Sequence, residues 1–275
     1  MSYEIDWDDA FANGAYIDGA AEFPPRWEGA ATAFRAGAHL RADIAYGPHP
    51  RERYDLFLPD TPPRGLVVFV HGGYWLKFDK SIWSHLAQGP VAQGWAVAMP
   101  SYTLAPEATI PQITAQIARA VEHAAGEVAG PIRLTGHSAG GHLVTRMICE
   151  DTPLPRAILD RIAHVLSISG LHDLRPLVQT QMNAELGLTD AVAQCESPAL
   201  HRPQPGIPVA AWVGGHERPE FLRQSALLRE AWARKSCAMR LYVDEGLHHF
   251  NVIDRLAQAD SALTQALLSG LGAPE

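Results

Sequence analysis

Short apolar runs alternate with amphipathic segments over most of the chain, and this alternation limits the possible folds more than any other feature. The run Leu66–Val70 is apolar throughout and the run Val-Leu-Ser-Ile-Ser at 165–169 is mainly apolar, which is typical of strands that are buried on both faces. Strands that are connected through helices run parallel, because the helix carries the chain back to the starting end of the sheet. From about residue 65 onward, the pattern therefore predicts a mostly parallel sheet with helices on both faces, preceded by an antiparallel pair.

The periodicity predicts eight strands and five longer helices. The strands are expected at His39–Ala45, Arg53–Leu58, Leu66–Val70, Trp95–Pro100, Ile132–Thr135, His164–Ser169, Val209–Val213 and Met239–Val243. The helices are expected at Ile82–Val91, Ile113–Val128, Leu143–Cys149, Phe221–Trp232 and Val252–Leu268. Residues 1–38 are expected to form an N-terminal arm of short helices, and residues 174–206 a cap-like insertion that overhangs the site.

Composition indicates a globular protein of one domain over residues 1–275. Hydrophobic residues make up 47% and charged residues 19% of the chain, which excludes a disordered or fibrous chain. The formal net charge of −8 argues against nucleic acid and against an anionic membrane surface as partners. A small-molecule substrate is the expected partner, and a homodimer stays open.

Cysteine usage and the N-terminal residues bear on the compartment. The three cysteines are far apart and form no CxxC pair, so neither a disulfide framework nor a zinc site is expected. The first residues are acidic, unlike a signal peptide, and no window approaches the ~18 apolar residues of a membrane span. We therefore expect a cytoplasmic protein.

A glycine-rich motif around Ser138 is the strongest chemical signal. The sequence Gly136-His-Ser138-Ala-Gly140 lies between an apolar strand and an amphipathic helix, where a nucleophile elbow must lie. Small flanking residues allow the tight turn that exposes a serine hydroxyl. The alternative is a glycine-rich turn with an incidental serine.

A second motif, His71-Gly72-Gly73-Tyr74-Trp75, follows the Leu66–Val70 run. A loop at this place can supply a backbone N–H to a developing oxyanion, together with the N–H of the residue after the nucleophile. Gly72 or Gly73 and Ala139 are therefore the expected oxyanion-hole donors. The alternative is a plain β-turn.

The base and the acid are inferred from the chain order serine, acid, histidine. His249 is the expected base because it follows the last predicted strand, with His248 as the alternative. Glu217 is the expected acid because it follows the strand before, with Asp173 as the alternative.

Aromatic and histidine side chains near the second motif are candidates for substrate binding. His71, Tyr74 and Trp75 are assigned to this role, and Trp83 is added as a possible wall of an aromatic leaving-group pocket. Packing in the core is the alternative for the aromatic side chains.

Together these motifs resemble the arylformamidase (kynurenine formamidase) branch of the α/β-hydrolases over roughly residues 50–260. The residues that carry the resemblance are His-Gly-Gly-Tyr-Trp at 71–75, Ser-Tyr-Thr-Leu-Ala-Pro at 101–106, Gly-His-Ser-Ala-Gly-Gly-His-Leu at 136–143, Gly-Leu-His-Asp-Leu-Arg-Pro-Leu at 170–177, Glu217, Glu-Phe-Leu-Arg-Gln-Ser at 220–225 and His-Phe at 249–250. The resemblance implies Ser138 as nucleophile, Glu217 as acid and His249 as base, without metal or other cofactor. Two positions depart from the branch, where Asp is common in place of Glu217 and often precedes the catalytic histidine in place of His248.

The sequence thus predicts an α/β-hydrolase fold with an eight-stranded, mostly parallel sheet. The predicted function is a serine hydrolase that cleaves small esters or N-formyl amides through an acyl-enzyme, with activity like that of an arylformamidase. A general short-chain carboxylesterase is the alternative enzyme. A non-catalytic binding protein with the same fold is the alternative from another class.

Overall fold

Eight strands form a single sheet in the computed structural model, which describes residues 5–269. The strands are β1 (His39–Ala45), β2 (Arg53–Leu58), β3 (Leu66–Val70), β4 (Ala96–Pro100), β5 (Ile132–His137), β6 (Ile162–Ile168), β7 (Val209–Gly214) and β8 (Met239–Asp244). Their order across the sheet is β1-β2-β4-β3-β5-β6-β7-β8. β2 is antiparallel to both β1 and β4, and all other neighbours are parallel. The predicted fold class is confirmed.

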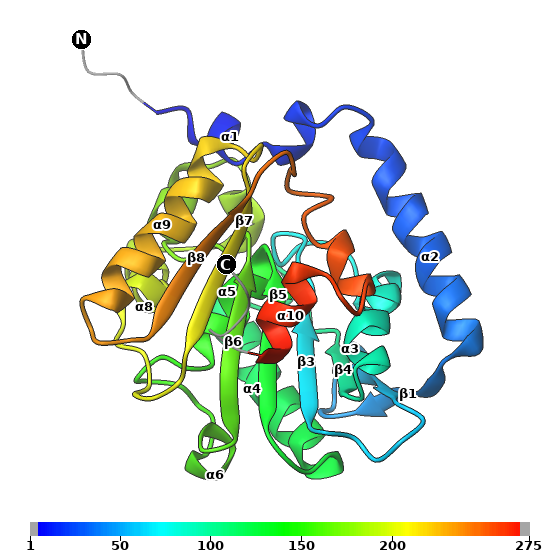
Figure 1. Ribbon diagram of the computed structural model, residues 1–275. Coiled ribbons are helices and arrows are strands. Elements are labelled where there is room, and N and C mark those ends of the chain that lie inside the picture. The colour runs from blue at the N-terminus through cyan, green and yellow to red at the C-terminus, as the bar shows by residue number, and fades with distance from the viewer. Residues whose placement is uncertain (1–4, 270–275) are drawn as a thin grey trace.

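Helices cover both faces of this sheet (Figure 1). The α-helices are α1 (Trp7–Ala10), α2 (Phe23–Gly37), α3 (Gln88–Ala92), α4 (Ile110–Glu127), α5 (Ala139–Arg146), α6 (Arg156–Leu159), α7 (Asn183–Leu186), α8 (Asp190–Cys195), α9 (Pro219–Ala233) and α10 (Ala262–Ser269). The 3-10 helices are η1 (Asn13–Tyr16), η2 (Ala20–Glu22), η3 (Lys80–Ala87), η4 (Arg175–Gln179), η5 (Pro198–Leu200) and η6 (Asp254–Ala257). None of the helices within residues 5–269 has the length and apolar character needed to cross a membrane.

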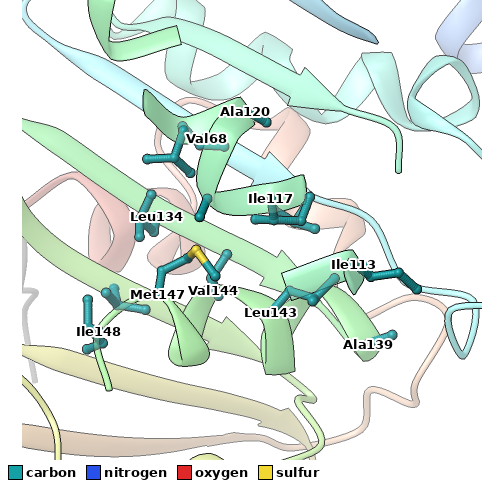
Figure 2. Close-up of a cluster of buried hydrophobic side chains, with 14 of the residues drawn as sticks. Val68, Ile113, Ile117, Ala120, Leu134, Ala139, Leu143, Val144, Met147 and Ile148 are labelled. Carbon is teal, nitrogen blue, oxygen red and sulfur yellow. The ribbon is translucent and has the colours of Figure 1, made fainter. Parts of the chain in front are cut away.

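The sheet separates two hydrophobic cores, because successive side chains of a strand point to opposite faces. On β3, Val68 packs into the core that α4 and α5 cover, whereas Val67 packs into the core on the other face. Figure 2 shows the first core, where Leu134 of β5 meets Leu143 of α5 and Ile117 of α4. Burial on both faces explains why the central strands are continuous apolar runs.

Two predicted helices are wrong in detail. The segment Val252–Leu268 was expected to be one helix, but it forms η6 and α10 with a turn between them. Ser261 causes this break: its hydroxyl donates to the Arg255 carbonyl (2.6 Å) and accepts the Thr264 N–H (3.1 Å), so it caps a new helix. Ile82–Val91 divides into η3 and α3, and Pro90 offers no N–H to continue an α-helical ladder through this stretch.

The N-terminal segment lies across the body as short helices that end in α2, drawn in blue in Figure 1. Trp27 of α2 contacts Trp83 of η3, with ring centroids 4.6 Å apart. Ion pairs from Asp9 to Arg218 and from Arg26 to Asp254 fasten the segment to distant parts of the chain. Residues 1–4 of the predicted arm lie outside the described residues.

The segment 174–206 contains η4, α7, α8 and η5 between β6 and β7. The backbone N–H of Gln181 donates to the Asp8 side chain at 2.8 Å, so the segment contacts the N-terminal arm. Its role as a cap stays a prediction.

Several histidines are buried in the body of the protein. Burial lowers the pKa of His71, His85 and His164 to about 4, and that of His142 and His172 to about 3. In the unfolded chain these groups take up protons near pH 6.5, before the folded protein does. Protons therefore favour the unfolded state at acidic pH.

We expect the free energy of unfolding to fall steeply as the pH drops from about 6.5 towards 4, by about 1.4 kcal/mol per pH unit for each such histidine. Urea titrations at several pH values measure this slope. His164→Leu removes one of the titrating groups and should make the slope shallower by about that amount. A variant slope equal to that of the wild type would contradict this explanation.

Candidate active site

Ser138 lies on a strained turn between β5 and α5. Its backbone has φ +56° and ψ −118°, a conformation that is unfavourable for a residue with a Cβ. The Ser138 N–H donates to the Ile168 carbonyl (2.9 Å), and the Ser138 carbonyl accepts the His142 N–H (3.1 Å). These bonds hold the serine at the carboxyl end of the sheet.

Glycines make this turn possible because the backbone passes too close for side chains. A Cβ at Gly140 would lie 1.9 Å from the Val70 carbonyl oxygen, and one at Gly136 would lie 2.4 Å from the Gly140 oxygen. Both distances are impossible for real atoms. The sequence motif is therefore required by the packing of the elbow against β3.

The loop after β3 lies directly against the elbow. A Cβ at Gly72 would lie 2.7 Å from the His137 carbonyl oxygen and 2.9 Å from the Ser138 Cβ. Gly73 has φ +107°, which favours glycine. Among residues 5–269, no hydrogen-bond acceptor is found for the N–H of Gly73 or of Ala139, so both remain available to a ligand.

His249 and Glu217 form a buried pair. Glu217 follows β7, His249 follows β8, and the His249 Nδ1 and Glu217 Oε2 atoms lie 2.6 Å apart. The other Glu217 oxygen accepts hydrogen bonds from the Ser169 hydroxyl (2.5 Å) and the Gly214 N–H (2.8 Å). A proton on Nδ1 is held by the carboxylate, which leaves Nε2 as the basic atom.

The His137 side chain contacts the backbone of His249, the expected base. Its Nε2 atom lies 2.9 Å from the His249 carbonyl oxygen, and the two rings are tilted, with centroids 4.5 Å apart. Burial keeps the pKa of His137 well below its ordinary value. The neutral ring can donate its N–H without placing a positive charge beside His249.

Ser138 and His249 both line a pocket of about 450 Å³. Within residues 5–269 no direct hydrogen bond joins their side chains, and such bonds often tighten only when substrate is bound. Aromatic side chains form much of the wall, namely Phe11, Trp27, Tyr74, Phe78, Trp83 and Phe250. The pocket suits a flat, apolar ligand beside a nucleophile.

The structure places only some of the predicted substrate-binding residues at the pocket. Tyr74 and Trp83 line the pocket, as expected for a binding role. Trp75 is completely buried beside His142, with ring centroids 5.2 Å apart, and His71 stacks on Tyr102 at 4.4 Å. Assigning Trp75 and His71 to substrate binding was therefore wrong. Tyr74 and Trp75 have positive φ, so the alternation of side chains that holds in a strand does not apply to this loop.

The two candidate acids have different partners. Arg175 donates to both carboxylate oxygens of Asp173, at 2.8 and 2.9 Å. Burial raises the pKa of Asp173, but the bonds from Arg175 outweigh this effect and leave the pKa below its ordinary value. Glu217 contacts the His249 ring, and Asp173 instead faces an arginine.

The two candidate bases, His248 and His249, also have different partners. His248 places its ring edge to face with Phe23 of the N-terminal arm, with centroids 5.3 Å apart, and its Nδ1 accepts the Phe250 N–H (3.2 Å). Burial lowers its pKa. His248 thus packs against the arm, while its neighbour His249 faces Glu217.

Some residues of the site carried no usable sequence signal. The arm contributes Phe11, Asn13 and Trp27 to the pocket, and Met182 and Glu185 of the segment 174–206 lie at the same pocket. Only the number of aromatic residues in the arm hinted at such a role. Within residues 5–269, no three His, Cys, Asp or Glu side chains come together in a way that could hold a metal ion.

Comparisons of sequence and structure show which known proteins this chain is similar to. The BD-FAE family model matches residues 54–185. A crystal structure of a candidate thioesterase from Silicibacter sp. TM1040 is 49% identical and superposes with a TM-score of 0.92, covering 97% of this chain and 100% of that one. The chain belongs to the α/β-hydrolase superfamily.

Further comparisons give relatives in sequence and a neighbour in fold. The kynurenine formamidase of Salmo salar is 29% identical over 253 residues, covering 86% of this chain and 84% of the relative. That of Danio rerio is 29% identical, covering 84% and 81%. An esterase of Pyrobaculum calidifontis, 17% identical with a TM-score of 0.70 over 90% of this chain and 91% of that one, shares the fold. Together with the 49% identical candidate thioesterase, these sequence relatives support a hydrolase of the arylformamidase or esterase type.

His248 and His249 make different contacts, so replacing each with alanine should have a different effect on turnover and stability. His249→Ala should lower kcat for p-nitrophenyl acetate by several orders of magnitude, because triad members act as a unit. His248→Ala should retain most activity and lose some thermal stability, since it removes a contact with the arm. The reverse ranking of the two kcat values would exclude His249 as the base.

The same assay distinguishes Glu217 from Asp173 as the acid. Glu217→Gln should lower kcat by roughly 10²–10⁴, because the amide no longer stabilises the charged imidazole. Asp173→Asn is the matched control, and its effect should appear in the unfolding temperature, with turnover per folded molecule nearly normal. An inactive but folded Asp173→Asn variant beside an active Glu217→Gln variant would move the acid to residue 173.

Proposed function

We propose that this chain is a serine hydrolase that cleaves aromatic N-formyl amides of the N-formylkynurenine type. The observation that carries the proposal is the Glu217–His249 hydrogen bond in a pocket that also holds Ser138 on a strained elbow. A base with a fixed tautomer and a serine on such a turn in the pocket wall are the parts that acyl transfer needs.

In the first half of the reaction, the Ser138 Oγ attacks the formyl carbon while His249 Nε2 accepts the hydroxyl proton. The N–H groups of Gly73 and Ala139 stabilise the oxyanion that forms on the formyl oxygen. The C–N bond then breaks, and His249 returns the proton to the leaving amine. The product that stays on the enzyme is the formyl ester of Ser138.

In the second half, water replaces the amine. His249 takes a proton from the water, and the resulting hydroxide attacks the formyl ester. The ester bond breaks, Ser138 recovers its proton from His249, and formate leaves. Glu217 stabilises the charged imidazole in both halves through its 2.6 Å contact with Nδ1.

The choice of an aromatic formamide rests on the pocket and on the relatives. Six aromatic side chains line a space of about 450 Å³, which suits an aromatic leaving group. The kynurenine formamidases of Salmo salar and Danio rerio align with this chain over more than four fifths of both lengths, 86% and 84% for that of Salmo salar. Both observations favour an aryl amine as the leaving group.

A short-chain ester or thioester is the second candidate substrate. It is favoured by the candidate thioesterase that is 49% identical to this chain. The same acyl-enzyme route applies, since only the leaving group changes from an amine to an alcohol or a thiol.

The test compares kcat/KM for N-formylkynurenine, p-nitrophenyl acetate, p-nitrophenyl butyrate and acetyl-CoA. We expect the formamide to exceed the others by at least about tenfold, a preference of about 1.4 kcal/mol in transition-state binding. Ser138→Ala should abolish turnover and labelling by a fluorophosphonate while leaving the protein folded. A preference for the thioester or an ester would support the second candidate, and no turnover of any substrate would favour a binding protein.

A further inference from the structure

We propose that Asn13, from the N-terminal arm, determines substrate specificity by hydrogen bonding to a carbonyl group on the aromatic leaving group. The inference rests on the proposed function, because it concerns the part of that substrate which departs as the amine. It assigns a recognition role to a residue outside the triad and outside the oxyanion loop.

The surroundings of Asn13 point to a ligand. The residue is only 5% exposed, and it lines the same pocket as Ser138. Within residues 5–269, neither atom of its side-chain amide has a hydrogen-bond partner. Buried amides are nearly always paired, so a buried unpaired amide in the wall of a pocket is placed for a bound molecule.

The backbone around Asn13 is held in place. The Asn13 N–H donates to the Phe11 carbonyl (2.9 Å), which also accepts the Tyr74 hydroxyl (2.7 Å). The Phe11 ring packs edge to face on Phe221, with centroids 6.2 Å apart. The side chain of Asn13 is therefore positioned before substrate arrives, which makes a hydrogen bond to substrate more favourable.

The other polar groups of the pocket are less suited to this role. Burial raises the pKa of Tyr74 and a contact with the Asn13 side chain opposes this shift, but the Tyr74 hydroxyl proton is donated to the Phe11 carbonyl. Lys77 and Glu185 line the pocket but are exposed, so water competes for their hydrogen bonds. The indole N–H groups of Trp27 and Trp83 and the Nδ1 atom of His137 also lack a partner in this wall, but each is a single donor or acceptor site, whereas the Asn13 amide offers both a donor and an acceptor.

This arrangement selects for a particular class of substrate. A substrate with a carbonyl on the aromatic ring satisfies the Asn13 NH₂ group, whereas a plain aryl formamide leaves it unpaired. Sites that are built to hydrogen bond a substrate discriminate strongly against analogues that lack the partner. The expected substrates are therefore aryl formamides that carry a ring-bound carbonyl.

The test uses Asn13→Leu, which keeps the branched shape of the side chain without its polar atoms, and two substrates that differ in the carbonyl. We expect wild-type kcat/KM to be higher for N-formylkynurenine than for formanilide, and the ratio to fall roughly ten- to hundredfold in the variant. Turnover of formanilide is the internal reference, and it should fall by a smaller factor than turnover of N-formylkynurenine, because formanilide has no carbonyl for Asn13 to bind. The unfolding temperature should not fall, because no hydrogen bond within the described protein is lost.

Tyr74→Phe serves as the control for a structural defect, since it removes the bond that holds the arm at Phe11. It should lower the unfolding temperature and change kcat/KM for both substrates alike. The inference is overturned if folded Asn13→Leu keeps the wild-type ratio, or if it behaves as Tyr74→Phe does. Asn13→Ala is measured in parallel and gives the same decision if the leucine variant does not fold.

Failure of the proposed function gives a different result. In that case the wild type cleaves neither formamide, and the same ratio is measured with 2-acetylphenyl acetate and phenyl acetate. A ratio that falls in Asn13→Leu supports recognition by Asn13 with esters as substrates. An unchanged ratio overturns it.

Discussion

Close contact between the elbow and the end of β3 is the constraint on which the rest of the site depends. Gly140 passes so near the Val70 carbonyl that no side chain fits, and a Cβ at Gly72 would lie only 2.9 Å from the Ser138 Cβ. These contacts bring the serine and the N–H groups of the following loop to one place. The parallel sheet makes this possible, because adjacent parallel strands such as β3 and β5 present their carboxyl ends at the same edge.

Burial of the Glu217 carboxylate is the main electrostatic feature of the site. A buried charge is stable only when its oxygens are hydrogen bonded. Glu217 meets this condition through Ser169, Gly214 and His249. The buried Asp173 carboxylate is hydrogen bonded by Arg175 instead. Because it already pairs with the arginine charge, it is less suited to stabilise a protonated histidine.

The sequence predicted the features that depend on local pattern. The central strands are buried on both faces and therefore need continuous apolar runs, which located them in the sequence. The exposed edge strand β1 and the partly exposed β8 were also predicted to within a few residues. The elbow needs glycines at set positions, so Ser138 could be located from its motif. The direction of Trp75 could not be predicted, because positive φ values in its loop break the periodicity on which such predictions rely. The place of Asn13 could not be predicted either, because it depends on how the arm folds back over the body.

The arm has a consequence for how the protein reaches its native state. Its hydrogen bonds join Arg218 to Asp9, 209 residues apart in sequence, and Arg26 to Asp254, 228 residues apart. The entropy lost on closing a loop grows with the number of residues in the loop, so contacts between such distant segments have a high entropic cost and slow folding. The arm is synthesised before the sheet, whereas its partners beyond residue 200 are synthesised after most of the strands. The aromatic pocket is thus completed only after these later segments are made, and after β3 and β5, which position Ser138.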